Sequence, residues 1–104
     1  MATRVRRSSN NVFRDLGFGA EESESLRIRA DLMLHISRLI DERGLTQAAA
    51  AKVFGVTQPR VSDLVRGKID RFSIDTLVDM LARADVYVRV TLRASAKRRR
   101  RQAA

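Results

Sequence analysis

The sequence predicts a single, mainly α-helical domain that ends in one β-strand. Apolar residues recur at helical spacings of three and four in successive segments between residues 21 and 81. Over residues 86–93 the pattern changes to strict alternation, which indicates a strand. A chain of 104 residues suits one domain whose thin core would gain from oligomerisation.

A long first helix is predicted from Glu21 to the stop at Gly44, with acidic residues at its positive N-terminal end. One face of this helix is predicted to be the buried one: Ile28, Leu32, Ile36 and Leu39. His35 lies at the edge of that stripe, as a packed or surface residue. Leu26, Met33 and Leu34 lie outside the stripe and need a second partner. Before the helix, four apolar residues are expected to dock on the domain: Val12, Phe13, Leu16 and Phe18.

Two short helices are predicted to follow, joined at Gly55. Thr46 can cap the first, which runs to Phe54 and carries four consecutive alanines that permit close packing. Thr57 caps the second, in which Pro59 occupies the first turn. Val61, Leu64 and Val65 form its buried side, so Pro59, Ser62, Asp63 and Arg66 point away from the core, with Gln58 and Arg60 at the exposed tip.

A fourth helix, capped by Ser73, follows the loop KIDRF, and the strand at residues 86–93 ends the domain. Inward positions on this helix are Ile74, Leu77, Val78 and Leu81. One face of the strand is apolar: Val86, Val88, Val90 and Leu92. A lone strand leaves backbone groups unpaired, so we expect it to pair with its own copy in a homodimer and to cover Leu26, Met33 and Leu34. Pairing within the chain, with residues 11–16, is the alternative.

Composition argues against several functions. There is no cysteine and one histidine, so neither thiol chemistry nor a metal cluster is expected. No nucleophile–base pair or phosphate loop is visible, which argues against an enzyme and against a bound cofactor. No apolar run approaches the roughly 18 residues of a membrane span, and the N-terminus lacks the apolar core of a signal peptide. We expect a soluble, cytoplasmic protein.

The basic residues are concentrated near the two ends of the chain. Eight of the 21 lie there (Arg4, Arg6, Arg7 and the run from Lys97 to Arg101), which leaves 13 basic against 12 acidic residues, a net charge of +1 for the rest. We therefore expect disordered basic tails at residues 1–10 and 94–104 around a domain at residues 11–93. Such tails are either solvated or contact a polyanion.

The two short helices around Gly55, the second with an exposed polar tip, form a helix-turn-helix of a size that fits the major groove of DNA. Residues 36–84, with LTQ, small residues and GV-TQ-x-x-VS-x-L-x-RGK between Leu45 and Lys68, resemble the Xre (phage-repressor-like) family. That resemblance implies a lambda-repressor-like bundle of about five helices and a sequence-specific transcriptional repressor on a palindromic operator in double-stranded DNA.

The flanking segments narrow the resemblance. NVFRDLGF and RFSIDTLVDMLARADVYVRVTLR are similar to the small HigA-like antitoxins of type II toxin–antitoxin systems, whose partner is commonly a RelE/HigB-like toxin. A stand-alone Xre-type regulator shares the same domain and remains an alternative. A protein-interaction module with a degenerate helix-turn-helix, and RNA binding through the arginine-rich tail, are the further alternatives.

The resemblance also implies roles for individual residues. Gln58 would read a base, and adenine suits glutamine, whereas Arg60 would reach guanine or a phosphate. Pro59 could touch a thymine methyl, and Asp63 could accept from cytosine N4. The residues expected at the DNA backbone are Gln47, Thr57, Ser62, Arg66, Lys68 and Arg71.

Overall fold

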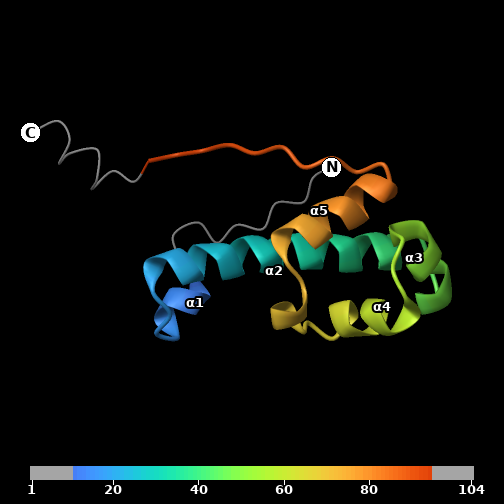
Figure 1. Ribbon diagram of the computed structural model, residues 1–104, viewed down its shortest axis with the longest axis horizontal. Coiled ribbons are helices and arrows are strands. Elements are labelled where there is room, and N and C mark those ends of the chain that lie inside the picture. The colour runs from blue at the N-terminus through green and yellow to red at the C-terminus, as the bar shows by residue number, and fades with distance from the viewer. Residues whose placement is uncertain (1–10, 95–104) are drawn as a thin grey trace, which may run out of the picture.

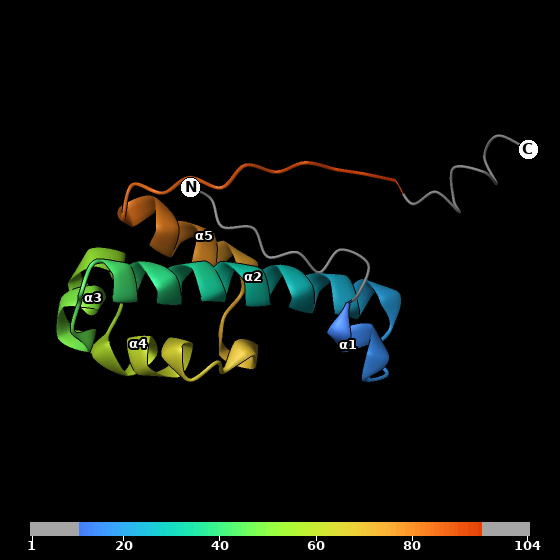
Figure 2. The same cartoon turned by 180° about the vertical axis from the view of Figure 1, so that it is seen from behind.

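Five α-helices and one 3₁₀ turn make up the computed structural model, which describes residues 11–94. In chain order they are α1 (Val12–Asp15), α2 (Ala20–Glu42), α3 (Gln47–Phe54), α4 (Gln58–Val65), η1 (Ile69–Arg71) and α5 (Ile74–Arg83). The long α2 is the central element: α5 lies along one side of it, α4 and η1 lie on the other, and α3 packs at its C-terminal end (Figures 1 and 2). The mainly helical fold class predicted from the sequence is therefore confirmed.

Local side-chain caps explain where three of the helices begin. Thr46 accepts a hydrogen bond from the Ala49 N–H at 3.0 Å and Ser73 accepts one from the Thr76 N–H at 3.1 Å. Thr57 accepts from the Arg60 N–H at 3.4 Å, beyond Pro59, which has no N–H to donate. These three caps agree with the sequence prediction.

The core lies where α2, α3, α4 and α5 meet. Its most completely buried large side chains are Phe54, Phe72, Ile36, Leu64, Leu77, Leu81 and Val61. Phe72 comes from the KIDRF segment, which was predicted to be an irregular loop. It follows η1 directly, and its burial in the core attaches η1 to the helices. Arg29 adds a hydrogen bond from its guanidinium to the Ile69 carbonyl oxygen at 3.5 Å.

The buried face of α2 differs from the predicted one. Leu26, Met33, Ile36 and Ile40 are buried, whereas Ile28, Leu32 and Leu39 are half-buried and Leu34 is exposed. The reason is that α1, α4, η1 and α5 together cover more than one side of α2. The most deeply buried residues of α2 therefore lie partly on the predicted stripe and partly beside it. Val65 on α4 was also predicted to be buried and is 41% exposed.

The N-terminal segment docks on α2 through polar groups, and of its four apolar side chains only Phe13 is half-buried. Fully buried Ser23 donates its hydroxyl to the Phe18 carbonyl oxygen at 3.2 Å, and the Asn11 amide donates to the Ser23 carbonyl oxygen at 3.2 Å. Val12, Leu16 and Phe18 remain 53%, 70% and 40% exposed, so the prediction that they dock was wrong for these three. Because residues 12–15 are helical, the alternative of strand pairing with residues 11–16 is wrong as well.

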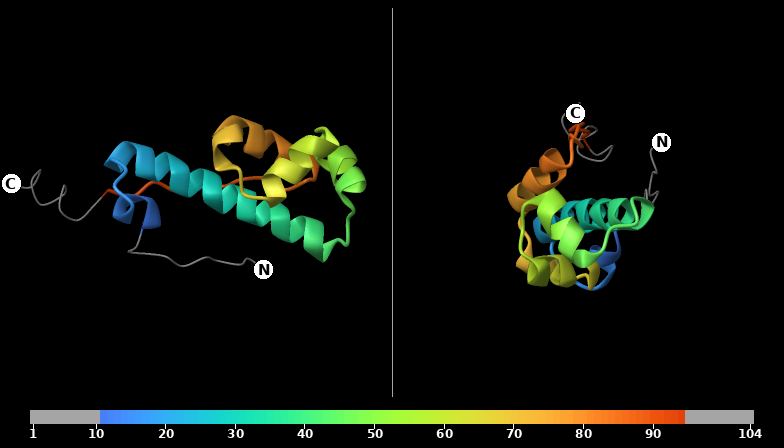
Figure 3. Two further views of the ribbon diagram at one scale, coloured as in Figure 1. Left: turned by 90° about the horizontal axis from the view of Figure 1, so that it is seen from below. Right: turned by 90° about the vertical axis from the view of Figure 1, so that its right-hand side faces the viewer.

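Residues 86–94 leave α5 as an extended segment that runs back past α2 on the side away from α4 (Figures 1 and 3). Asp85, with φ 62°, turns the chain, and the Val86 N–H donates to the Leu81 carbonyl oxygen at 2.9 Å. Within the described residues the segment forms no strand ladder, and Val90 and Leu92 are 74% and 89% exposed. Leu26 and Met33 are already buried inside the chain and need no cover from it. The predicted tail at 1–10 lies outside the described residues, as does the predicted tail at 94–104 apart from its first residue.

Candidate nucleic-acid interface

The helix-turn-helix consists of α3, the turn at Gly55 and α4. Gly55 has the left-handed conformation, with φ 70°, and the Val56 N–H donates to the Ala51 carbonyl oxygen at 3.0 Å. Ala50 is fully buried, and its small side chain lets α3 approach its neighbours closely. Val61 and Leu64 hold the inner side of α4 at 1% and 2% exposure. The opposite side of α4 is therefore the one left for a ligand.

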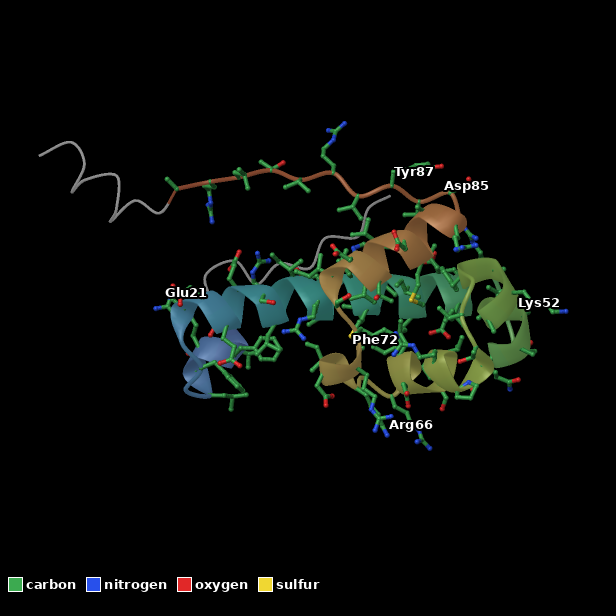
Figure 4. All side chains as sticks on the ribbon, viewed as in Figure 1. Glu21, Lys52, Arg66, Phe72, Asp85 and Tyr87 are labelled. Carbon is green, nitrogen blue, oxygen red and sulfur yellow. The ribbon has the colours of Figure 1, made fainter. Side chains whose placement is uncertain are left out.

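The predicted DNA-contacting residues gather on α4 and the loop that follows it. Thr57, Gln58 and Pro59 are exposed at the N-terminal tip of α4, and Arg66 is exposed at its C-terminal end, where it points away from the bundle (Figure 4). Gln47 is exposed at the start of α3. The remaining predicted phosphate contacts are the half-buried Ser62 and Lys68 and the exposed Arg71.

Arg60 is engaged inside the domain. Its guanidinium lies over the Phe72 ring, 4.3 Å from the ring centroid, and donates to the Arg71 carbonyl oxygen at 2.8 Å. Both contacts favour a positive charge without neutralising it. Arg60 thus joins α4 to the loop around η1, with one guanidinium nitrogen bonded to the Arg71 carbonyl oxygen and the guanidinium plane over the Phe72 ring.

Asp63 is also paired. One carboxylate oxygen lies 3.2 Å from the Arg71 guanidinium, and the side chains of Asp63 and Arg71 are 19% and 53% exposed. The main chain reinforces this link, because the Asp63 carbonyl oxygen accepts from the Lys68 N–H at 3.0 Å. Among the described residues, Arg66 and Lys68 form no ion pair, so their charge is available to a phosphate.

Sequence reasoning missed Phe72 and its two roles, in the core and beneath Arg60. The available signal was a phenylalanine in a short loop of otherwise mostly polar residues, since an aromatic ring of that size is seldom left in water. The pairing of Asp63 with Arg71 was also missed, because the two residues are brought together by the turn at Gly67 rather than by helical spacing.

Other kinds of site find little support in the described part of the chain. Residues 11–94 contain no group of three or more side chains placed to hold a metal ion. None of their helices is both long enough and apolar enough to cross a membrane.

Comparisons with known proteins agree with that geometry. A family model described as a helix-turn-helix domain matches residues 12–93, and it defines the chain as a helix-turn-helix DNA-binding protein. A solved structure, named provisionally as an XRE family transcriptional regulator, is 32% identical, with a TM-score of 0.67 over 73% of this chain and 85% of that chain. The chain belongs to this XRE family of transcriptional regulators, a family of DNA-binding proteins rather than of enzymes. The curated proteins yield no match.

Proposed function

We propose that this protein is a repressor that binds a palindromic operator as a homodimer, with α4 of each copy in the major groove. The observation that carries the proposal is the division of α4 into two sides. Val61 and Leu64 fix one side in the core, while Gln58 and Pro59 are exposed at the tip that meets base edges in this class of protein. In this arrangement Gln58 reads adenine and Pro59 contacts a thymine methyl.

The DNA backbone contacts come from residues that border α4 on both sides. Gln47 and Thr57 sit at the starts of α3 and α4, where backbone N–H groups also favour a phosphate. Ser62 within α4 supplies a hydrogen bond, and Arg66, Lys68 and Arg71 beyond the helix supply hydrogen bonds and positive charge. Such contacts fix the register of the protein on DNA without reading its sequence.

The extended segment at residues 86–94 supports the homodimer. Its backbone groups have no ladder partner within the described residues, and Tyr87, Val90 and Leu92 are 75%, 74% and 89% exposed. Antiparallel pairing with a second copy would satisfy those groups with one sequence about a two-fold axis. Because the segment lies on the side away from α4 (Figure 1), pairing leaves both recognition helices free on the opposite face. They would address half-sites about 34–36 Å apart.

We further propose that the protein is the antitoxin of a type II toxin–antitoxin operon that it represses, with a RelE/HigB-like toxin as its partner. Apolar surface at the α1 end of the molecule, remote from α3 and α4 (Figure 1), is consistent with a protein partner beyond DNA and a second copy. Val12 and Leu16 there are more than half exposed.

Base reading is tested by Gln58→Ala, with Arg66→Ala as the matched control. Affinity is measured on a duplex selected by the wild-type protein from a random library and on a random duplex. Gln58→Ala should lose about 1–3 kcal/mol on the selected duplex only and relax the preference at one base pair. Arg66→Ala should weaken both duplexes alike and flatten the salt dependence. Equal weakening of both duplexes by Gln58→Ala would contradict the assignment of α4.

Dimerisation is tested by Val88→Asp with Val90→Asp, which places two charges on the apolar face of the extended segment. Sedimentation should show monomers that keep their helical circular dichroism and bind the selected duplex weakly. Tyr87→Asp with Thr91→Asp puts the same two charges on the other face and should remain dimeric. A dimeric Val88/Val90 variant would show that this segment is not the interface.

The antitoxin role is tested by co-expressing the tagged protein with the untagged product of the adjacent gene. We expect the two to co-purify, and expression of the neighbour alone to arrest growth. A harmless neighbour that does not co-purify would leave a stand-alone regulator, provided that operator binding is intact.

A further inference from the structure

The recognition helix carries one acidic side chain, Asp63, on a surface that otherwise suits phosphate. Around it, α4 and the loop to Arg71 contribute Arg60, Arg66 and Lys68, and one further carboxylate at Asp70. A carboxylate close to DNA repels the phosphates unless a donor meets it. Asp63 therefore needs one partner in the free protein and another on DNA.

In the free protein, the partner of Asp63 is the Arg71 guanidinium. The two side chains meet at 3.2 Å, but unequally: Asp63 is 19% exposed, whereas Arg71 is 53% exposed. The Arg71 guanidinium is thus the solvent-facing member of the pair. A phosphate can bind this guanidinium without any rearrangement of the main chain. The main chain of the loop is held independently, because Arg60 grips the Arg71 carbonyl oxygen and stacks on Phe72.

We propose that Asp63 and Arg71 form an exchangeable pair, in which DNA binding transfers Arg71 to a phosphate and leaves Asp63 to select an amino group on a base. This inference rests on the proposed placement of α4 in the major groove. The freed carboxylate can only accept, so it favours the N4 amino group of cytosine and is repelled by the acceptors on guanine and thymine. Adenine, which presents an amino donor beside an acceptor, is intermediate.

Through this exchange Asp63 contributes to specificity by disfavouring duplexes that present a hydrogen-bond acceptor at its position. On a mismatched duplex the protein loses the Asp63–Arg71 pair and faces a base acceptor with an unpaired carboxylate. On the matched duplex the amino donor replaces Arg71 as the partner of Asp63. Discrimination by an unfavourable wrong contact is a general route to specificity when the favourable contacts are few.

The experiment compares Asp63→Asn with Asp70→Asn, which removes the same charge from the neighbouring η1 turn. Wild type and both variants are used to select duplexes from a random library, and their affinities are measured on the wild-type selection and on a random duplex. Asp63→Asn should bind the random duplex more tightly, lose the cytosine preference at one position and show a specificity ratio lower by about tenfold. Asp70→Asn should keep the wild-type base preference at every position.

Exchange itself is tested by adding Arg71→Gln to wild type and to Asp63→Asn. Once Asp63 no longer competes for Arg71, the loss of affinity caused by Arg71→Gln should be larger in the Asp63→Asn background. Equal losses in the two backgrounds, or an unchanged base preference in folded Asp63→Asn, would overturn the proposal. Thermal unfolding of each variant verifies that it is folded. A wild-type protein that selects no sequence would instead refute the proposed function.

Discussion

Replacing Gly55 with alanine tests how the turn of the helix-turn-helix is built. Two effects act at this position. Gly55 adopts φ 70°, a conformation that costs an L-residue about 1–2 kcal/mol. In addition, a Cβ atom at this position would collide with the end of the Arg83 side chain from α5. Arg83 is exposed, so its side chain can move aside rather than displace the backbone. Moving this side chain out of its preferred rotamer costs about 0.5–1.5 kcal/mol.

The expected total is a loss of about 1.5–3.5 kcal/mol in the free energy of unfolding. Such a loss lowers Tm by about 4–8 °C for each kcal/mol in a domain of this size. Gly67→Ala is the matched control, because Gly67 has φ 75° and open space where the Cβ atom would lie. Urea unfolding should show a smaller loss for Gly67→Ala, and Arg83→Ala should recover the excess in the Gly55→Ala background. Equal losses at Gly55 and Gly67 would refute the part assigned to Arg83.

Four further perturbations probe the helices and the tail. Thr57→Ala removes the cap of α4 and should lower the free energy of unfolding by about 1 kcal/mol in urea titrations. Leu77→Ala opens a cavity at a fully buried position and should cost about 2–5 kcal/mol by the same method. Deletion of residues 97–104 should weaken binding to a random duplex and flatten its salt dependence while keeping sequence preference, as measured by titration at two salt concentrations. The hydrogen bond from Arg27 lowers the pKa of Glu24, so this pair stabilises α2 above the usual carboxyl pKa and is lost as the pH falls through the lowered one. Glu24→Gln should therefore reduce Tm slightly at about pH 7 and leave it unchanged at about pH 2.

The limits of the helices could be predicted from the sequence because local chemistry decides them. Thr46, Thr57 and Ser73 cap the helices that follow them through side-chain hydrogen bonds spanning three residues. Gly44 and Gly55 end α2 and α3 in the left-handed backbone conformation, which glycine adopts at little cost. Because caps and terminal glycines act over only a few neighbouring residues, the local sequence contains all the information needed to place these helix ends.

The buried face of α2 could not be predicted, because four other elements determine it. Periodicity locates a stripe of apolar residues on α2. The positions of α1 and α5 then decide which of them are enclosed, so that Leu26 is buried and Ile28 only half-buried. The same limitation applies to Arg60. Helical spacing gives the direction in which its Cβ atom points, whereas the guanidinium lies several bonds further on and folds back to Phe72, twelve residues along the chain. Contacts of that kind depend on tertiary structure.

The turn at Asp85 has a consequence for the length of DNA that a dimer can span. Asp85 holds φ 62°, and the hydrogen bond from the Val86 N–H to the Leu81 carbonyl oxygen ties the start of the extended segment to the end of α5. In a strand-paired dimer this joint sets the distance and the rotation between the two recognition helices. One residue inserted after Asp85 would turn every side chain of the segment to the opposite face and shift its register. In the proposed dimer, the variant would keep its affinity for a single half-site but would require a different number of base pairs between the two half-sites. The turn at Asp85 would then set the half-site spacing that the dimer accepts.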